Sequence, residues 1–174
     1  MGCMRYSVIV PVYKNADSIP RLIQALTDMN TTLENQLEVV FVVDGSPDDS
    51  FLLLKQALGA MSFSAQLLAH SRNFGSFPAI RTGLMAAKGD YFGVMAADLQ
   101  EPPELLISFF KSLSNDECDV AIGTRNARQD PFSSRMASSI FWGLYRRLVV
   151  HDMPAGGVDI FGCNKAFREQ LLQL

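Results

Sequence analysis

The sequence has no excess of positive charge and little cysteine, and each shortage excludes a class of protein. Lysine and arginine number 15 against 18 aspartates and glutamates, so the formal net charge is −3 and no basic surface for nucleic acid is expected. The three cysteines are an odd number without Cys-x-x-Cys spacing, which is unlike a disulfide framework. We therefore expect Cys3, Cys118 and Cys163 to be the reduced thiols of a cytosolic protein.

Long apolar runs are missing as well. No stretch of about 18 uncharged apolar residues occurs, so no segment of this chain is predicted to span a bilayer as a helix. The first residues, MGCMRYSVIVPVY, lack the cleavage pattern of a signal peptide. At 174 residues, one domain covering 1–174 is expected. The chain stops within an apparent helix, NKAFREQLLQL, which fits either an excised domain or a naturally short form.

What the chain does contain is an alternation of apolar, strand-like runs with segments of helical period. Strands are predicted at 5–13, 37–43, 66–69, 91–97 and 118–123. Helices are predicted to start near residue 18, to run from the turn cluster 44–50 to about 61, to end at 87, and to cover 103–115. This rhythm predicts an α/β fold with a mostly parallel sheet and helices on both faces.

The most informative stretch is 89–104, GDYFGVMAADLQEPPE. Its apolar run carries no charge until Asp98, which lies just past the carboxyl end of the predicted strand, where open α/β sheets bind ligands. Pro102 and Pro103 then end the strand and favour the start of a helix. On these grounds Asp98 is either a solvated loop or capping acid, or an acid held by a metal or a ligand.

The segment AADLQEPPE resembles the D-x-D-L-Q-D-P-P-E segment of family 2 glycosyltransferases, especially the branch that loads sugars onto polyprenyl phosphates. The resemblance implies a Rossmann-like GT-A fold and transfer of a sugar from a nucleotide diphosphate donor with inversion at the anomeric carbon. In the family, both acids and the glutamine lie near a divalent ion, Mg²⁺ or Mn²⁺, and the donor diphosphate. Here Asp98 and Gln100 remain as metal residues, whereas Ala96 replaces the first acid. Either one carboxylate, the diphosphate and water suffice for the metal, or metal use is weakened.

Further motifs of the same family imply nucleotide-sugar-binding residues at other strand ends. In SVIVPVY, the residues Pro11, Val12 and Tyr13 match positions that enclose the base. In VVDGS, Asp44 is expected to accept a hydrogen bond from a base N–H or a ribose hydroxyl, although Val43 replaces the family's other acid. The R-N-x-G loop and the Asp98 segment complete the set with Arg72, Asn73, Ala97 and Asp98. An ordinary turn, strand-end packing and a helix cap are the alternative interpretations.

Three residues late in the chain match the family's catalytic positions. Arg125 and Arg135 resemble arginines that face the donor diphosphate or the acceptor phosphate, a role that suits the bidentate guanidinium. Asp159 matches the acid of the family's G-x-D-F segment, and is expected to act as a general base or to orient the acceptor or donor. The alternative for each arginine is a surface position. His70 is predicted to be a strand-end surface residue rather than a catalyst.

The resemblance also implies an acceptor and a location. Residues 133–150, SSRMASSIFWGLYRRLVV, are predicted to form a helix whose aromatic residues and arginines suit a membrane interface, or else a helix packed on the core. A polyprenyl phosphate is the favoured acceptor, and the cytoplasm at the inner face of the membrane is the expected location. A saccharide or cell-surface polysaccharide acceptor, or a catalytically weak nucleotide-sugar-binding module, stays open.

Overall fold

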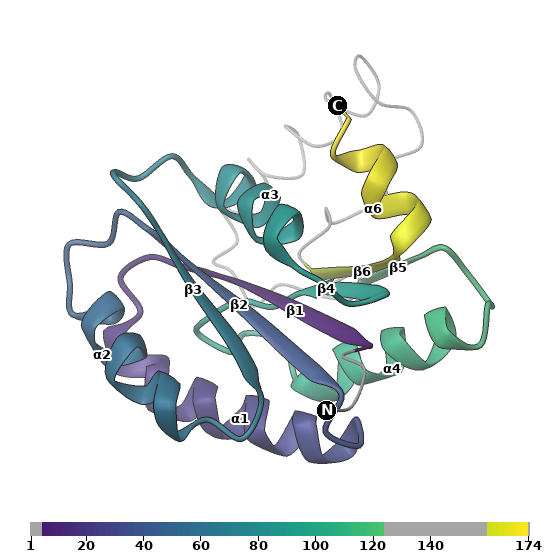
Figure 1. Ribbon diagram of the computed structural model, residues 1–174, viewed down its shortest axis with the longest axis horizontal. Coiled ribbons are helices and arrows are strands. Elements are labelled where there is room, and N and C mark those ends of the chain that lie inside the picture. The colour runs from purple at the N-terminus through teal and green to yellow at the C-terminus, as the bar shows by residue number, and fades with distance from the viewer. Residues whose placement is uncertain (1–4, 124–159, 174) are drawn as a thin grey trace, which may run out of the picture.

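The computed structural model describes residues 5–123 and 160–173, which form a six-stranded sheet with the strand order β3-β2-β1-β4-β6-β5 (Figure 1). The strands are β1 (Tyr6–Val12), β2 (Leu37–Asp44), β3 (Ser64–His70), β4 (Tyr91–Val94), β5 (Val120–Gly123) and β6 (Ile160–Asn164). Strand β1 pairs in parallel with β2 and β4, and β2 pairs in parallel with β3. The mostly parallel sheet predicted from the sequence is therefore confirmed.

One strand was not predicted. Strand β6 lies between β4 and β5 and is antiparallel to both. It has five residues and contains Gly162, so it is too short and too weakly patterned to give a strand signal of its own. Gly162 is opposite Gly93 in the pairing with β4, and the fit at Gly93 is close because an added Cβ there would lie 2.5 Å from the Leu106 side chain.

Helices cover both faces of the sheet, as the sequence predicted. They are α1 (Ile19–Thr32), α2 (Ser50–Ala57), α3 (Ser76–Ala86), α4 (Pro103–Ser114) and α6 (Lys165–Leu171), with short 3₁₀ turns η1 (Ala16–Ser18) and η2 (Leu58–Ala60). Figure 1 shows α1, α2 and α4 on one face and α3 and α6 on the other.

Strict alternation along the central strands explains the two layers. On β1, Val8 and Val10 belong to the apolar cluster shared with α1 and α4, whereas Ile9 belongs to the cluster shared with α3. On α1, Leu22 and Leu26 are fully buried one turn apart and form part of the stripe that faces the sheet. Since β1 is buried on both sides, it forms the rigid centre from which the loops at its carboxyl end project.

The order of the strands creates a crevice. From β1 the chain moves to β2 and β3 on one side, and it then crosses to β4 on the other side of β1. Connections therefore leave β1 and β4 in opposite directions, which opens a space beyond the carboxyl ends of these two strands.

The described residues include two of the three cysteines, and their helices can be compared with the length of a membrane span. Cys118, half-buried, and Cys163, buried, are free thiols, whereas Cys3 lies outside the described ranges. Burial raises the pKa of the Cys163 thiol to about 12, so this group is neutral and inert at ordinary pH. Within 5–123 and 160–173, none of the helices has both the length and the apolar character needed to cross a bilayer.

Candidate functional site

A pocket of about 330 Å³ lies at the crevice between the carboxyl ends of β1 and β4. Its lining consists of Pro11, Val12, Tyr13, Asn15, Asp44, Asn73, Gly75, Ser76, Ala96, Ala97 and Asp98. Every residue expected from the sequence to bind the nucleotide sugar is in this lining except Arg72. Four separate segments of the chain therefore converge on one cavity, as parallel strands that end at one edge of a sheet require.

The loop after β1 forms one wall and is held by side chains from the loop after β2 and from the first residue of α2. The backbone N–H of Lys14 donates to Ser46 Oγ at 2.8 Å, and that of Asn15 donates to Ser50 Oγ at 3.2 Å. Lys14 itself has a φ of 56°, a left-handed conformation that these bonds help to maintain. The Tyr13 side chain, 41% exposed, is thereby presented at the mouth of the pocket.

Asp48 joins the same two loops. Its carboxylate accepts from Ser46 Oγ at 2.5 Å, from the Ser50 N–H at 3.2 Å and from the Ala16 N–H at 3.0 Å. Partial burial by itself would raise the pKa of Asp48, but the hydrogen bonds from these hydroxyl and backbone donors outweigh it and lower the pKa to about 2. The charged Asp48 carboxylate therefore links the two loops, although it does not itself line the pocket. The sequence predicted only that Asp48 belongs to a turn.

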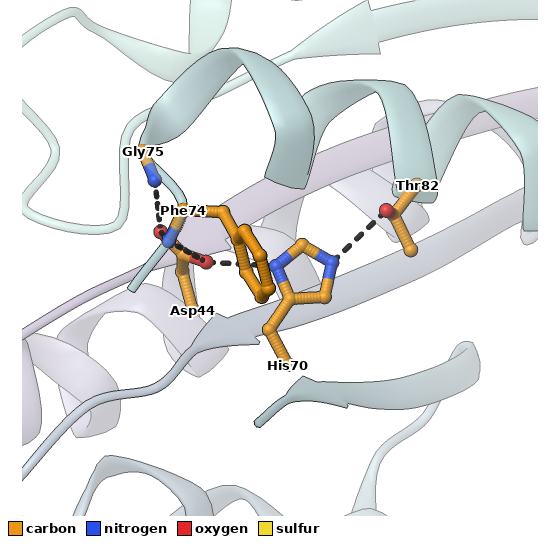
Figure 2. Close-up of polar contacts among 5 residues, drawn as sticks. All are labelled: Asp44, His70, Phe74, Gly75 and Thr82. Carbon is orange, nitrogen blue, oxygen red and sulfur yellow. Dashed lines mark hydrogen bonds and ion pairs between the residues drawn. The ribbon is translucent and has the colours of Figure 1, made fainter. Parts of the chain in front are cut away.

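Asp44, the last residue of β2, connects the pocket to the loop before α3 (Figure 2). The residue is 3% exposed, and its Oδ2 accepts from the Gly75 N–H at 2.7 Å. The Phe74 N–H is shared between Oδ1 at 3.0 Å and Oδ2 at 3.1 Å, and His70 Nδ1 lies 2.7 Å from Oδ1. Burial opposes ionisation, but these three donors lower the pKa of Asp44, so the carboxylate is charged. The expected contact of Asp44 with a base or ribose stays a prediction.

Gly45 allows the β2 turn and the loop 71–75 to meet. Its φ is 58°, and an added Cβ would lie 2.2 Å from the carbonyl carbon of Arg72 and 2.4 Å from the nitrogen of Asn73. Only glycine fits this approach. The contact places Asn73 in the pocket lining, whereas the Arg72 guanidinium lies over the Phe74 ring, 4.7 Å from its centroid.

His70 is not the surface residue predicted from the sequence. Its side chain is 15% exposed and lies between Asp44 and Thr82, with Nε2 3.0 Å from Thr82 Oγ1 (Figure 2). The strand-end position is confirmed, since β3 ends at His70, but the surface position is wrong because the pairing of β2 with β3 places His70 directly beside Asp44. Predicting this contact requires the register of the β2–β3 pair, and the pattern of a single strand does not supply that register.

The Asp98 segment forms the opposite wall. Strand β4 ends at Val94 rather than at the predicted residue 97, and the Met95 N–H continues the pairing by donating to the Ile9 carbonyl at 3.0 Å. The chain then turns, with Leu99 at a φ of 58°. This turn leaves Asp98 exposed at the pocket, where Gln100 Nε2 donates to its Oδ2 at 2.6 Å. A left-handed backbone is uncommon and unfavourable for a residue with a β-carbon such as Leu99. Residues in such conformations often occur at functional sites.

The donor set at this wall fits a metal that arrives with a diphosphate. Within residues 5–123 and 160–173, no group of three or more His, Cys, Asp or Glu side chains is placed to hold an ion. Ala96 lines the pocket without a ligand atom, so Asp98 supplies the carboxylate there. Mg²⁺ is commonly bound through one or two carboxylates together with substrate phosphates and water. Gln100 donates to Asp98 and is not in the pocket lining, and its expected role as a metal residue stays a prediction.

Several predicted residues cannot be placed. Arg125, Arg135, Asp159 and the predicted helix 133–150 lie outside the described ranges. The described chain ends before this segment at Gly123 and resumes at Ile160, and these two residues are register partners in the β5–β6 pair.

The family model and the curated relatives that match this chain agree with one another. The sequence model of Glycosyl transferase family 2 matches residues 7–174. The chain is 33% identical over 169 residues to the undecaprenyl-phosphate 4-deoxy-4-formamido-L-arabinose transferase of Klebsiella pneumoniae (strain 342), covering 97% of this chain and 50% of that protein. It is 38% identical over 169 residues to the transferase of the same name from Pseudomonas savastanoi pv. phaseolicola, covering 95% and 48%. The chain thus spans about half the length of these curated relatives.

Solved structures agree on the fold. The mannosyltransferase PcManGT from Pyrobaculum calidifontis, in complex with GDP-Man and Mn²⁺, superposes with a TM-score of 0.68 at 20% identity, covering 98% of this chain and 47% of that one. At this identity the similarity concerns the fold alone, and it confirms the predicted GT-A architecture.

Proposed function

The chain belongs to glycosyl transferase family 2, and we propose that it transfers a sugar from a nucleotide diphosphate donor to a polyprenyl phosphate, with inversion at the anomeric carbon. The observation that carries the proposal is the convergence of the family's nucleotide-binding motif residues on one pocket at the β1–β4 crevice. The names of the curated relatives, which are undecaprenyl-phosphate sugar transferases, support the acceptor class.

The lining of the pocket suggests which end of it receives the base of the donor and which end receives the diphosphate. The aromatic and backbone surface of Pro11–Tyr13 suits the flat base, with Asp44 and Asn73 as hydrogen-bonding groups beside it. The Ala97–Asp98 wall then receives the diphosphate, near the start of α3 at Gly75 and Ser76. This orientation directs the sugar away from the base and toward the outer end of the crevice.

Asp98 would hold a divalent ion, Mg²⁺ or Mn²⁺, which when bound neutralises charge on the leaving diphosphate as a Lewis acid. The protein's own part is to keep the Asp98 carboxylate oriented, and the 2.6 Å bond from Gln100 supports that role. With alanine at position 96, the site offers fewer protein ligands than the family's D-x-D pair, so affinity for the ion depends strongly on the nucleotide.

The remaining roles rest on the family motifs. Arg125 and Arg135 face the donor diphosphate or the acceptor phosphate, since a planar guanidinium binds two phosphate oxygens at once. Asp159 orients the acceptor or donor rather than removing a proton, because a phosphate acceptor is already ionised near neutral pH. A polyprenyl acceptor places the reaction at the membrane, at its cytoplasmic face, and the family resemblance assigns a role in lipid binding to residues 133–150.

The direct test is a transfer assay. Purified protein is incubated with undecaprenyl phosphate in detergent, Mn²⁺ and a panel of labelled UDP- and GDP-sugars, and label is measured in the organic extract. Label in the lipid fraction supports the proposal, whereas label in a soluble saccharide product would favour a saccharide acceptor. Nucleotide binding without release or transfer of sugar would favour a binding module, an alternative that the alanine at position 96 motivates.

A further inference from the structure

We propose that His70 is a positioning residue of the nucleotide pocket, and that it acts by fixing the carboxylate of Asp44. The inference rests on the proposed function, because it assigns a role in donor binding. His70 is absent from the pocket lining, whereas Asp44, Asn73 and Gly75 are part of it. The imidazole therefore acts on the donor through these residues.

The hydrogen-bond chemistry determines which ring nitrogen donates to Asp44. An ionised Asp44 only accepts, so His70 Nδ1 carries the proton in the 2.7 Å contact with Oδ1. Nε2 then accepts from the Thr82 hydroxyl at 3.0 Å when the ring is neutral, or donates to the same oxygen when the ring is protonated. The ring is held at both ends, between the end of β3 and the body of α3, in either state (Figure 2).

The pattern of bonds on Asp44 shows why the ring matters. The Phe74 N–H lies almost equally far from the two oxygens, at 3.0 and 3.1 Å, so it does not determine how the carboxylate is rotated. Rotation is set by the two shorter bonds at opposite oxygens, Gly75 N–H on Oδ2 and His70 on Oδ1, both at 2.7 Å. Without the His70 donor, one of the two bonds that define the plane is lost.

A rotated Asp44 has consequences inside the pocket. Asp44 is one of the residues that line the cavity, and its carboxylate accepts from the N–H of Gly75, on the loop that continues back to Asn73 in the same lining. The ring of Phe74 also contacts His70 edge to face, with centroids 5.4 Å apart. Because Gly45 packs tightly against the same loop, the loop has little space to move and restore the lost hydrogen bond. Loss of the imidazole is therefore expected to weaken nucleotide binding more than it slows the chemical step.

The test compares three variants by calorimetry with UDP and GDP in the presence of Mn²⁺, and by steady-state kinetics. His70→Leu removes the donor, and we expect Kd and KM for the donor to rise about 10-fold, the equivalent of one hydrogen bond to a charged group, with kcat within about 2-fold. His70→Asn keeps an N–H donor near the Nδ1 position and is expected to stay within about 3-fold of wild type. Thr82→Val removes the hydrogen-bond partner of His70 Nε2, and its Kd is expected to lie between those of the two His70 variants.

Thr27→Val is the matched control for the threonine variant, because Thr27 Oγ1 donates to the Ile23 carbonyl on α1, away from the pocket. Equal Kd values for wild type, His70→Leu and Thr82→Val would overturn the inference. Equal weakening by His70→Leu and His70→Asn would overturn it too, since the imidazole itself would then be needed. If His70→Leu does not fold, Thr82→Val decides: a raised Kd supports positioning and an unchanged Kd refutes it. A wild-type protein that binds no nucleotide contradicts the proposed function instead.

Discussion

Replacing Gly45 by alanine tests the architecture of the pocket most sharply. An added Cβ would lie 2.2 Å from the Arg72 carbonyl carbon, whereas ordinary contact begins near 3.4 Å, so the loop 71–75 has to retreat by about 1.2 Å. The hydrogen bonds from the Phe74 and Gly75 N–H groups to Asp44, now 3.0 and 2.7 Å, do not survive a displacement of that size.

The energetic cost follows from two contributions. Alanine at a φ of 58° costs about 1–2 kcal/mol, and losing hydrogen bonds to a charged acceptor costs about 1.5–3 kcal/mol. A total of about 2.5–5 kcal/mol corresponds to a fall in Tm of about 5–20 °C for a chain of this length. Because Asn73 and Gly75 line the pocket, nucleotide affinity is expected to fall at least about 10-fold as well.

Thermal unfolding and calorimetry with UDP and GDP provide the measurement. Gly59→Ala is the matched control, because an added Cβ there meets no atom within 4 Å, and its effect should stay within about 0.5 kcal/mol. If Gly45→Ala has the Tm and the nucleotide Kd of wild type, the contact between the β2 turn and the loop 71–75 does not hold the pocket together.

Three further predictions concern single carboxylates. Asp98→Asn should lower transfer by about 100-fold or more without changing Tm, because Asp98 is exposed and outside the core; wild-type turnover would refute its role. Ala96→Asp should tighten Mn²⁺ binding in the presence of nucleotide, and an unchanged titration would mean that another group supplies the missing ligand. Asp48→Asn should destabilise the fold by about 1 kcal/mol at pH 7, measured by urea unfolding, because solvent screening at this half-buried site reduces the effect of the pKa shift. The pKa of Asp48 is lowered from 3.8 to about 2, so its stabilisation is present above about pH 4, and the difference between Asp48→Asn and wild type should vanish as the pH falls toward 2; a difference that is independent of pH would contradict this origin.

The sequence predicted the central strands well because their signal is local. Strands were expected at 5–13 and 37–43 and are found at Tyr6–Val12 and Leu37–Asp44, since continuous β-branched runs are typical of strands buried on both faces. Strand β6 was missed because nothing local distinguishes Ile160–Asn164; its position depends on antiparallel pairing with β4 and β5.

The site was predictable in part for a related reason. Parallel strands bring their carboxyl ends together, so motif residues spaced far apart along the chain were expected at one edge, and the pocket contains them. The supporting contacts were not predictable. The pairing of Asp44 with His70 requires the register of β2 and β3, and the role of Asp48 requires the relative position of two loops. Single-sequence patterns carry neither kind of information.

The binding of a nucleotide at the β1–β4 crevice can be tested by an amide chemical-shift titration of the ¹⁵N-labelled protein with UDP and GDP in the presence of Mg²⁺, because this measurement locates the ligand residue by residue. We expect the largest shifts at Tyr13, Asn73 and Asp98, around the β1–β4 crevice. Little change is expected at the apolar groove between α3 and α6, where Ile80 and Phe161 lie. An absence of shifts with both nucleotides, or shifts confined to the α3–α6 groove, would contradict nucleotide binding at the crevice.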